Sequence, residues 1–285
     1  MVKLGSNGVK LKEVYGGSDN ALLLRLYEEV FLGSFPEDEL GPPWWDPSSE
    51  MDTTTIDTRT WTLVALDDAD EVLGGLVTEW FPASEVLLLS YLAVSKDHRG
   101  QGVGSYLLKT ATERHYGHPG YQLVLGELED PRHWSAAGQD PLARLQFYEP
   151  FGVLVLTIPY FQPPVAPGRP PAYHMLLASF DPVAPGILPG PVADGMRVRK
   201  FIEEYLHETS MATSATEVMV PDATWLLSYY DGQDIPLIPL LDYRAVPDPD
   251  PPGYTPGLST VEATVDQSTG KEGREPHSNS SDSSR

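Results

Sequence analysis

The chain has 285 residues, of which 19 are basic and 41 acidic, so its formal net charge is −22 and its pI is about 4.5. This charge argues against a nucleic-acid partner, because a protein that binds a polyanion needs a basic surface that releases counterions. No apolar run approaches the roughly 18 to 20 residues that span a bilayer, and residues 1–12 lack the apolar stretch of a signal peptide. We therefore expect a cytoplasmic protein with no membrane partner.

Cysteine is absent, which excludes disulfides, thiolate nucleophiles and zinc sites built on sulfur. His115 and His118 are spaced as metal ligands can be, but they stand among glycine and proline residues with no carboxylate pattern around them. We interpret both as loop residues and expect no metal ion.

Residues 21–31 begin the series of predicted elements. Asp19 or Asn20 is suited to cap a helix here, and the apolar residues that follow recur with helical spacing. The predicted apolar face consists of Leu23, Leu24, Tyr27, Val30 and Phe31. The segment therefore predicts an amphipathic helix.

An antiparallel meander is predicted next. Residues 61–66 and 71–80 read as strands joined by the acidic turn 67–70, and the apolar run 86–94 follows. Further along, the pattern predicts a helix over 105–115, a strand over 121–128, a helix over 141–149, and strands over 153–159 and 173–180. This order indicates mixed α and β structure around one sheet.

The chain is predicted to have three parts. A proline-rich stretch, 181–191, separates a main domain, 1–180, from a shorter block, 181–244. That block contains a predicted helix over 196–207 with an apolar face, but it buries too little to fold alone, so we expect a helical appendage packed on the main domain. Residues 245–285 hold almost nothing apolar and predict a disordered acidic, polar tail.

The segment 87–109 carries the chemical signal, because an apolar strand runs through a glycine-rich turn directly into a helix. A helix start presents unpaired N–H groups and the positive end of the helix dipole, and glycine allows an anion to come close. Lys96 and Arg99 add local positive charge. An anion cradle is thus one interpretation, and an ordinary connecting turn is the other. A Rossmann fingerprint would need glycine at Ser105, and a Walker loop would need Lys and then Ser or Thr after the last glycine.

Residues 99–104, Arg-Gly-Gln-Gly-Val-Gly, resemble the acetyl-CoA signature of the GNAT superfamily of N-acetyltransferases. About 45 residues later, 144–152 resembles the second helix of that family, with its Phe-Tyr pair and the glycine before the next strand. The resemblance covers roughly residues 9–180. It implies an α+β fold with a mixed, mainly antiparallel central sheet flanked by helices. The loop residues it assigns to coenzyme A are Arg99, Gly100, Gln101, Gly102, Val103 and Gly104, of which the last four would hold the pyrophosphate through backbone amides. The main chain at Leu92 and Val94 would pair with the pantetheine arm like an added strand.

The activity that this resemblance implies is acyl-CoA-dependent N-acyl transfer, with acetyl-CoA as co-substrate and direct attack by a primary amine in a ternary complex. The acidic surface favours a cationic small-molecule acceptor by long-range attraction. The alternative is a non-catalytic protein that binds acyl-CoA as a sensor or scaffold. The acceptor, the acyl group, the oligomeric state and the role of the appendage stay open at this point.

Proton transfer requires an acid and a base. By resemblance, Tyr148 is the general acid that protonates the leaving thiolate, and a half-buried packing role is its alternative. Some family members carry a base on the strand before the loop, but leucines occupy that stretch here, at 87–89. The candidate bases are Glu127, Glu129 and Glu79, each of which could instead be a solvated surface acid, and a water chain is a further option.

The acceptor pocket is expected to be walled by aromatic segments. These are residues 129–135, Trp44–Trp45 and Trp80–Phe81. Ordinary packing at a domain edge is the equal alternative. The second helix has no asparagine at its start, and Asp140 followed by Pro141 is expected to cap it instead.

Overall fold

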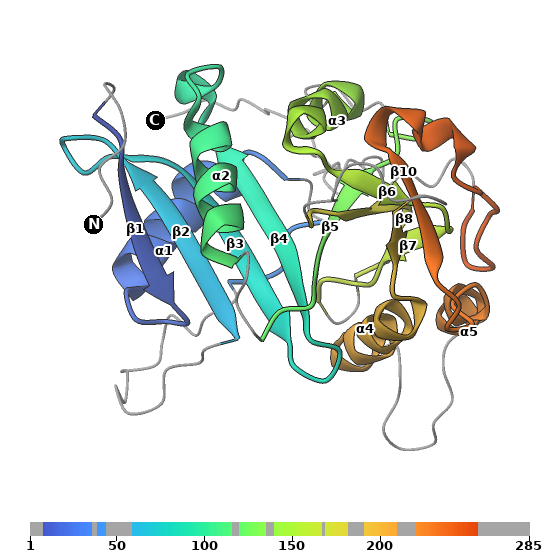
Figure 1. Cartoon of the computed structure of the whole chain (residues 1–285). Helices are drawn as coiled ribbons and strands as arrows, with labels where there is room; N and C mark the ends of the chain where they lie inside the picture. Colours follow the sequence, from blue (N-terminus) through green and yellow to red (C-terminus); the bar gives the residue numbers. More distant parts are fainter. Residues whose placement is uncertain are drawn as a thin grey trace, which may run out of the picture. The chain divides into compact units, whose positions relative to one another are not determined.

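The computed structural model describes residues 8–35, 39–43, 59–115, 120–134, 140–166, 169–181, 191–209 and 221–255. Within these ranges ten strands form one sheet, in the order β1-β2-β3-β4-β5-β8-β6-β10-β9, with β7 also paired to β8 (Figure 1). The strands are β1 (Lys10–Tyr15), β2 (Thr60–Leu66), β3 (Val72–Phe81), β4 (Val86–Val94), β5 (Leu123–Glu129), β6 (Leu154–Leu156), β7 (Tyr160–Gln162), β8 (Ala172–Ser179), β9 (Val192–Ala193) and β10 (Ile235–Pro239). Among these strands only β4 and β5 pair in parallel. The predicted mixed, mainly antiparallel sheet is confirmed.

Five α-helices flank the sheet in the described ranges. They are α1 (Asn20–Leu26), α2 (Val103–His115), α3 (Pro141–Tyr148), α4 (Gly195–Glu208) and α5 (Pro221–Ser228). The predicted helix 21–31 is α1 followed by a π-helical turn, Tyr27–Phe31. Both predicted caps are confirmed, because the Asp19 side chain accepts from the Leu22 N–H and the Asp140 side chain from the Ala143 N–H.

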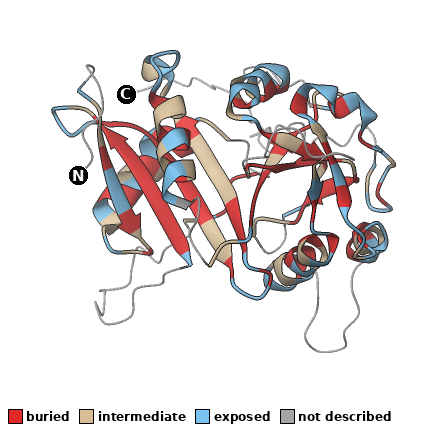
Figure 2. Cartoon of the chain, viewed as in Figure 1, coloured by how far each residue is buried: buried red, intermediate tan, exposed pale blue. Residues whose placement is uncertain are grey.

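The strands at the centre of the sheet are mostly buried (Figure 2), and their side chains belong to three buried clusters. One cluster joins β2–β4 to α2 and α3 through residues such as Leu76 and Leu107, and another joins the opposite face to α1 through Leu23 and Val77. A third cluster, around Phe201, packs α4 and α5 on β5, β7 and β8. None of the described helices is both long and apolar enough to cross a membrane.

The segment after residue 181 is more closely integrated than the sequence predicts. Instead of packing only as an appendage, it adds β10 to the central sheet, where β10 pairs with β6 on one side and β9 on the other. The described residues up to Tyr254 form one compact unit. The sequence concealed this because β10 contains Pro236 and Pro239, residues that normally argue against a strand inside a sheet.

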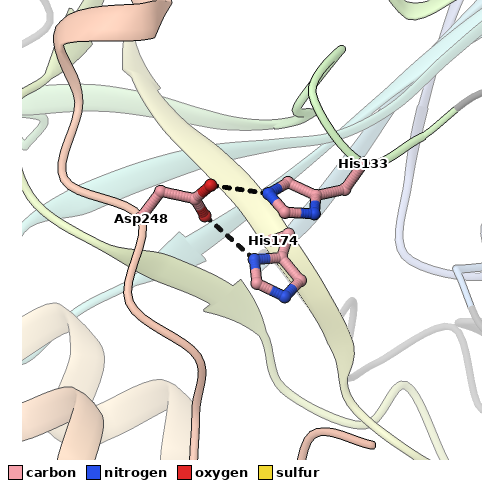
Figure 3. Close-up of side chains that lie close together, drawn as sticks. All are labelled: His133, His174 and Asp248. Atoms are coloured by element: carbon pink, nitrogen blue, oxygen red, sulfur yellow. Dashed lines mark hydrogen bonds and ion pairs between the residues drawn. The ribbon is translucent and has the colours of Figure 1, made fainter. Parts of the chain in front are cut away.

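The expected start of the tail at residue 245 is too early, because the residues just after it contact the main domain. Asp248 accepts hydrogen bonds from His133 Nε2 at 2.6 Å and His174 Nδ1 at 2.9 Å (Figure 3). Arg132 adds a hydrogen bond to the carbonyl of Val246. We call Asp248 with these two histidines the Asp248 anchor, which fixes residues 246–248 on β8. The rest of the expected tail, residues 256–285, lies outside the described residues.

Burial acts to raise the pKa of Asp248, but the hydrogen bonds from His133 and His174 and the charge of Arg132 outweigh it, so the pKa lies below its usual value. A carboxylate of this kind contributes stability above its unfolded pKa of about 3.9, and the contribution is lost as the pH falls through the folded value.

We therefore expect Asp248→Asn to lower the free energy of unfolding at pH 7 by about 1 to 3 kcal/mol, because the amide lacks the charge that the anchor holds. Urea unfolding at pH 7 and at pH 3 measures this effect. The difference between the variant and the parent should shrink at pH 3, and an equal difference at both pH values would contradict the role of the charge.

Candidate active site

The site begins where two neighbouring strands separate. β4 and β5 pair only from Val86–Leu89 against Leu123–Gly126, although β4 continues to Val94 and β5 to Glu129. Beyond the paired part, a cavity of about 50 Å³ lies between the strands. Its walls include Ser90–Leu92 from β4 and Gly126–Leu128 from β5.

A β-bulge explains the separation. Against β3, Val77 pairs with Tyr91 but Thr78 pairs with Leu89, so Ser90 is an extra residue in β4. A bulge bends its strand and increases the local twist. This bulge falls at the residue directly after the last one that pairs with β5, and it therefore turns the end of β4 away from β5.

The glycine-rich loop follows the free end of β4. Arg99 Nε donates to the carbonyl of Val94 at 3.2 Å, and Gln101 Nε2 donates to the carbonyl of Asp97 at 3.0 Å. Gly100 and Gly102 have φ values of +74° and +85°, a region that favours glycine. A Cβ atom at either position would meet nothing within 4 Å, so the loop is open above its backbone.

The start of α2, directly after this loop, also leaves backbone donors without intrahelical partners. Tyr106 N–H donates to the carbonyl of Gly102, which leaves the N–H groups of Val103, Gly104 and Ser105 ahead of the first intrahelical bond. With the helix dipole, these groups favour an anion. The loop therefore fits the expected diphosphate of coenzyme A, and β4 offers an edge from residue 90 to 94 that no described strand covers on the β5 side.

Glu127 lines the cavity and is held by two hydroxyl groups. Tyr160 donates to its Oε1 at 2.6 Å and Tyr205 to its Oε2 at 3.3 Å. Burial raises the pKa of Glu127 to about 7, with a contribution from the charge of Glu79, while the two tyrosine hydrogen bonds act to lower it. A carboxylate with this pKa exchanges protons near neutral pH.

The other two candidate bases have different surroundings. Glu129 is buried at the end of β5 and forms an ion pair with Arg144 of α3 at 2.7 Å, so its charge is already compensated. Glu79, on β3, lies close enough to Glu127 to raise its pKa but does not line the cavity. Of the three glutamates, Glu127 alone therefore lines the cavity.

Tyr148 is at the end of α3 and also lines the cavity. Its ring packs edge-on against Phe180, with 5.2 Å between the centroids, and only 8% of the residue is exposed. Burial raises the pKa of Tyr148 to about 12, although the charge of Arg144 acts to lower it. The phenol therefore keeps its proton at neutral pH.

The expected aromatic walls have other contacts. Trp80 packs against Tyr121, and Phe81 is buried against Phe201 of α4, so neither lines the cavity. From 129–135, Arg132 and His133 contact the C-terminal segment instead. Phe81 is covered by α4, and Arg132 and His133 are held by the C-terminal segment. Both contacts join residues far apart in the sequence, so the local patterns did not predict them. Trp44–Trp45 lies outside the described residues.

Three site residues were missed from the sequence. Tyr205 falls within the predicted helix 196–207, and Tyr160 follows the predicted strand 153–159. No local motif marks either hydroxyl, since both meet Glu127 through long-range packing. Ser90 is the third omission, because a bulge has no signature in an apolar run.

The Asp248 anchor is also a candidate metal site. One ligand atom from each of its three residues lies within 4.8 Å of the other two, in the part of the chain that the structure describes. Its imidazole rings are stacked, with centroids 3.8 Å apart and planes inclined by 14°. The His133 Nε2 and His174 Nδ1 atoms are both used in hydrogen bonds to the Asp248 carboxylate. Arg132 lies 3.7 Å from the same carboxylate, and its charge opposes a cation. This geometry suits hydrogen bonding better than metal binding. The interpretation of His115 as a loop residue was wrong, because it is the last residue of α2. His118 lies outside the described residues, so its loop role stays a prediction.

Comparison with known proteins gives a family for part of the chain. Residues 58–152, about a third of the chain, match the family model described as an acetyltransferase (GNAT) domain. No curated protein matches the chain.

Several solved structures are similar at low identity. One described as an acetyltransferase of the GNAT family from Bacteroides thetaiotaomicron is 18% identical, with a TM-score of 0.45, over 61% of this chain and 88% of that one. An acetyltransferase from Thermus thermophilus is 18% identical, with a TM-score of 0.38, over 61% and 98%. The ribosomal-protein-S18-alanine N-acetyltransferase from Escherichia coli is 13% identical, with a TM-score of 0.38, over 63% and 98%.

The matched range contains the glycine-rich loop, Glu127 and Tyr148. The resemblance seen in the two sequence motifs is confirmed, and this chain carries a GNAT acetyltransferase domain in residues 58–152.

Proposed function

We propose that the protein transfers an acetyl group from acetyl-CoA to a primary amine by direct attack in a ternary complex. The observation that carries this proposal is the position of Glu127, a carboxylate with a pKa of about 7 in the cavity between the separated ends of β4 and β5. Tyr148 lines the same cavity, as does Leu92 of β4, the strand that leads into the glycine-rich loop.

The loop and β4 would bind the co-substrate. Backbone N–H groups at residues 101–104 would hold the diphosphate, and the free edge of β4 near Leu92 and Val94 would pair with the pantetheine arm. This places the thioester toward the cavity. Neutral backbone donors are well suited to the task, because the overall charge of the chain repels a polyphosphate.

Glu127 would act as the general base. An alkylammonium has a pKa near 10 and no lone pair, so it must lose a proton before its nitrogen attacks the thioester carbonyl. Transfer to a group with a pKa of about 7 costs roughly 4 kcal/mol, against roughly 8 kcal/mol for a carboxylate with an ordinary pKa. Burial of Glu127 thus roughly halves the cost of forming the free amine.

Tyr148 would act as the general acid. As the C–N bond forms and the C–S bond breaks, the departing thiolate would take the phenolic proton. A phenol that is fully protonated at neutral pH and lines the same cavity suits this role.

The acceptor is expected to be cationic. Glu39 and Glu127 line the cavity, and Glu79 lies near Glu127, so among the described residues there the acidic groups outnumber the one basic group, Arg144, which is paired with Glu129. Such a cavity attracts an ammonium group and then removes its proton. The alternative, a non-catalytic acyl-CoA sensor, is favoured by the leucines at 87–89, where some family members carry a base. The carboxylate of Glu127 on the neighbouring strand weakens that argument.

We expect Glu127→Gln to lower kcat by about 10² to 10⁴, because the amide cannot accept the amine proton. In the parent, kcat should rise with pH through about 7, since the base acts only when ionised. Release of free coenzyme A across a panel of amines measures both effects. Glu28→Gln, at an exposed glutamate, is the matched control. Unchanged turnover in Glu127→Gln would remove the assignment of the base, and no release from the parent with any amine would favour the sensor.

Tyr148→Phe should lower kcat at least about tenfold with little change in the KM for acetyl-CoA, because only the proton donor to the thiolate is lost. Steady-state kinetics at saturating amine test this, with Tyr229→Phe at a more exposed tyrosine as the control. A Tyr148→Phe enzyme that turns over at the parental rate would show that another group protonates the thiolate.

A further inference from the structure

We propose that Tyr205, on α4, is a positioning residue for Glu127, so that the C-terminal segment 191–254 completes the catalytic site of a domain whose family match ends at residue 152. This inference rests on the proposed role of Glu127 as the base.

Each oxygen of Glu127 has its own hydroxyl donor. Tyr160 donates to Oε1 at 2.6 Å and Tyr205 to Oε2 at 3.3 Å. Two donors on two different oxygens restrict rotation of the carboxylate plane. They also leave lone pairs on both oxygens for the proton of an acceptor. Gln162 forms a side-chain hydrogen bond to Tyr205 and so orients the second hydroxyl in turn.

Helix α4 is fixed in position by the turn between β3 and β4. Glu204 accepts hydrogen bonds from the N–H groups of Ala83 and Ser84 at 3.2 and 3.0 Å, and from the Ser84 hydroxyl at 2.9 Å. Arg197 donates to the carbonyl of Ser84 at 2.9 Å from the preceding part of the helix. These contacts place Tyr205, the residue after Glu204, next to the sheet.

Ring packing restrains the same tyrosine. Phe81, at the end of β3, lies edge-on to Phe201 and Tyr205, with centroids 5.0 and 5.4 Å away. The aromatic ring is therefore held by the core, and its hydroxyl is the part that reaches Glu127. The ring of Tyr205 makes the packing contacts and its hydroxyl makes the hydrogen bond to Glu127. Removing only the hydroxyl therefore tests the hydrogen bond and leaves the packing in place.

The groups around Glu127 come from five elements. Glu79 of β3 disfavours its negative charge, whereas Tyr160 of β7 and Tyr205 of α4 favour it. The same cavity is also lined by Tyr91 of β4, Arg144 of α3 and Glu39. Arg144 is paired with Glu129. Because Tyr205 stabilises the ionised form, loss of its hydroxyl should make Glu127 harder to ionise.

The test is the pH dependence of kcat in Tyr205→Phe. The limb at lower pH, where Glu127 ionises, should move to higher pH by about one unit, and kcat below pH 7 should fall about tenfold. The matched control is Tyr230→Phe, which removes another buried hydroxyl of the same segment, one that donates to the carbonyl of Pro159 instead. The control should keep the parental pH profile even if its thermal stability falls.

A second measurement gives the pKa of Glu127 directly, without enzyme turnover. NMR titration of glutamate labelled with ¹³C at the carboxyl carbon, assigned with Glu127→Gln, gives the pKa of Glu127 in the parent and in Tyr205→Phe. A folded Tyr205→Phe variant with the parental pKa and pH profile would overturn the inference while leaving the base assignment intact. An active Glu127→Gln enzyme would overturn the base assignment itself. If Tyr205→Phe does not fold, Gln162→Leu, which removes the partner that orients Tyr205, should move the pKa in the same direction, and no movement would overturn the inference.

Discussion

The end of pairing between β4 and β5 is the constraint on which the rest of the site depends. Parallel strands that stayed paired to their ends would fill this space with their own hydrogen bonds. Here one extra residue, Ser90, bends β4 away after Leu89, and the two strands then have edges facing a cavity. The edge of β4 leads directly to the glycine-rich loop and the start of α2, so the backbone donors and the cavity are set by a single structural feature.

The chemistry of the cavity follows from its burial. A carboxylate in water has too low a pKa to take a proton from an ammonium group efficiently, and a buried one without partners would be costly to keep. Glu127 lies between these limits, because burial and Glu79 raise its pKa while Tyr160 and Tyr205 supply hydrogen bonds to the charged form. Glu129, two residues away, is matched with Arg144 and serves as a structural ion pair.

Local patterns predicted the parts of the fold that have local causes. Short stretches of sequence are enough to predict the helix caps at Asp19 and Asp140, the meander of β2–β4 and the glycine turn into α2. The pairing of Glu127 with Tyr205 was not predictable, because 78 residues separate them and only packing brings them together. The strand β10 was concealed by its prolines, and the anchoring of residues 246–248 by a composition typical of a disordered tail.

The most direct measurement is a calorimetric titration of the purified protein with acetyl-CoA, beside Gly102→Val. We expect one site per chain in the parent. We expect binding to be weakened about tenfold or more in the variant, because a β-branched residue is strained at a φ of +85° even though the space around it is open. Absence of binding in the parent, or equal affinity in both proteins, would contradict the account.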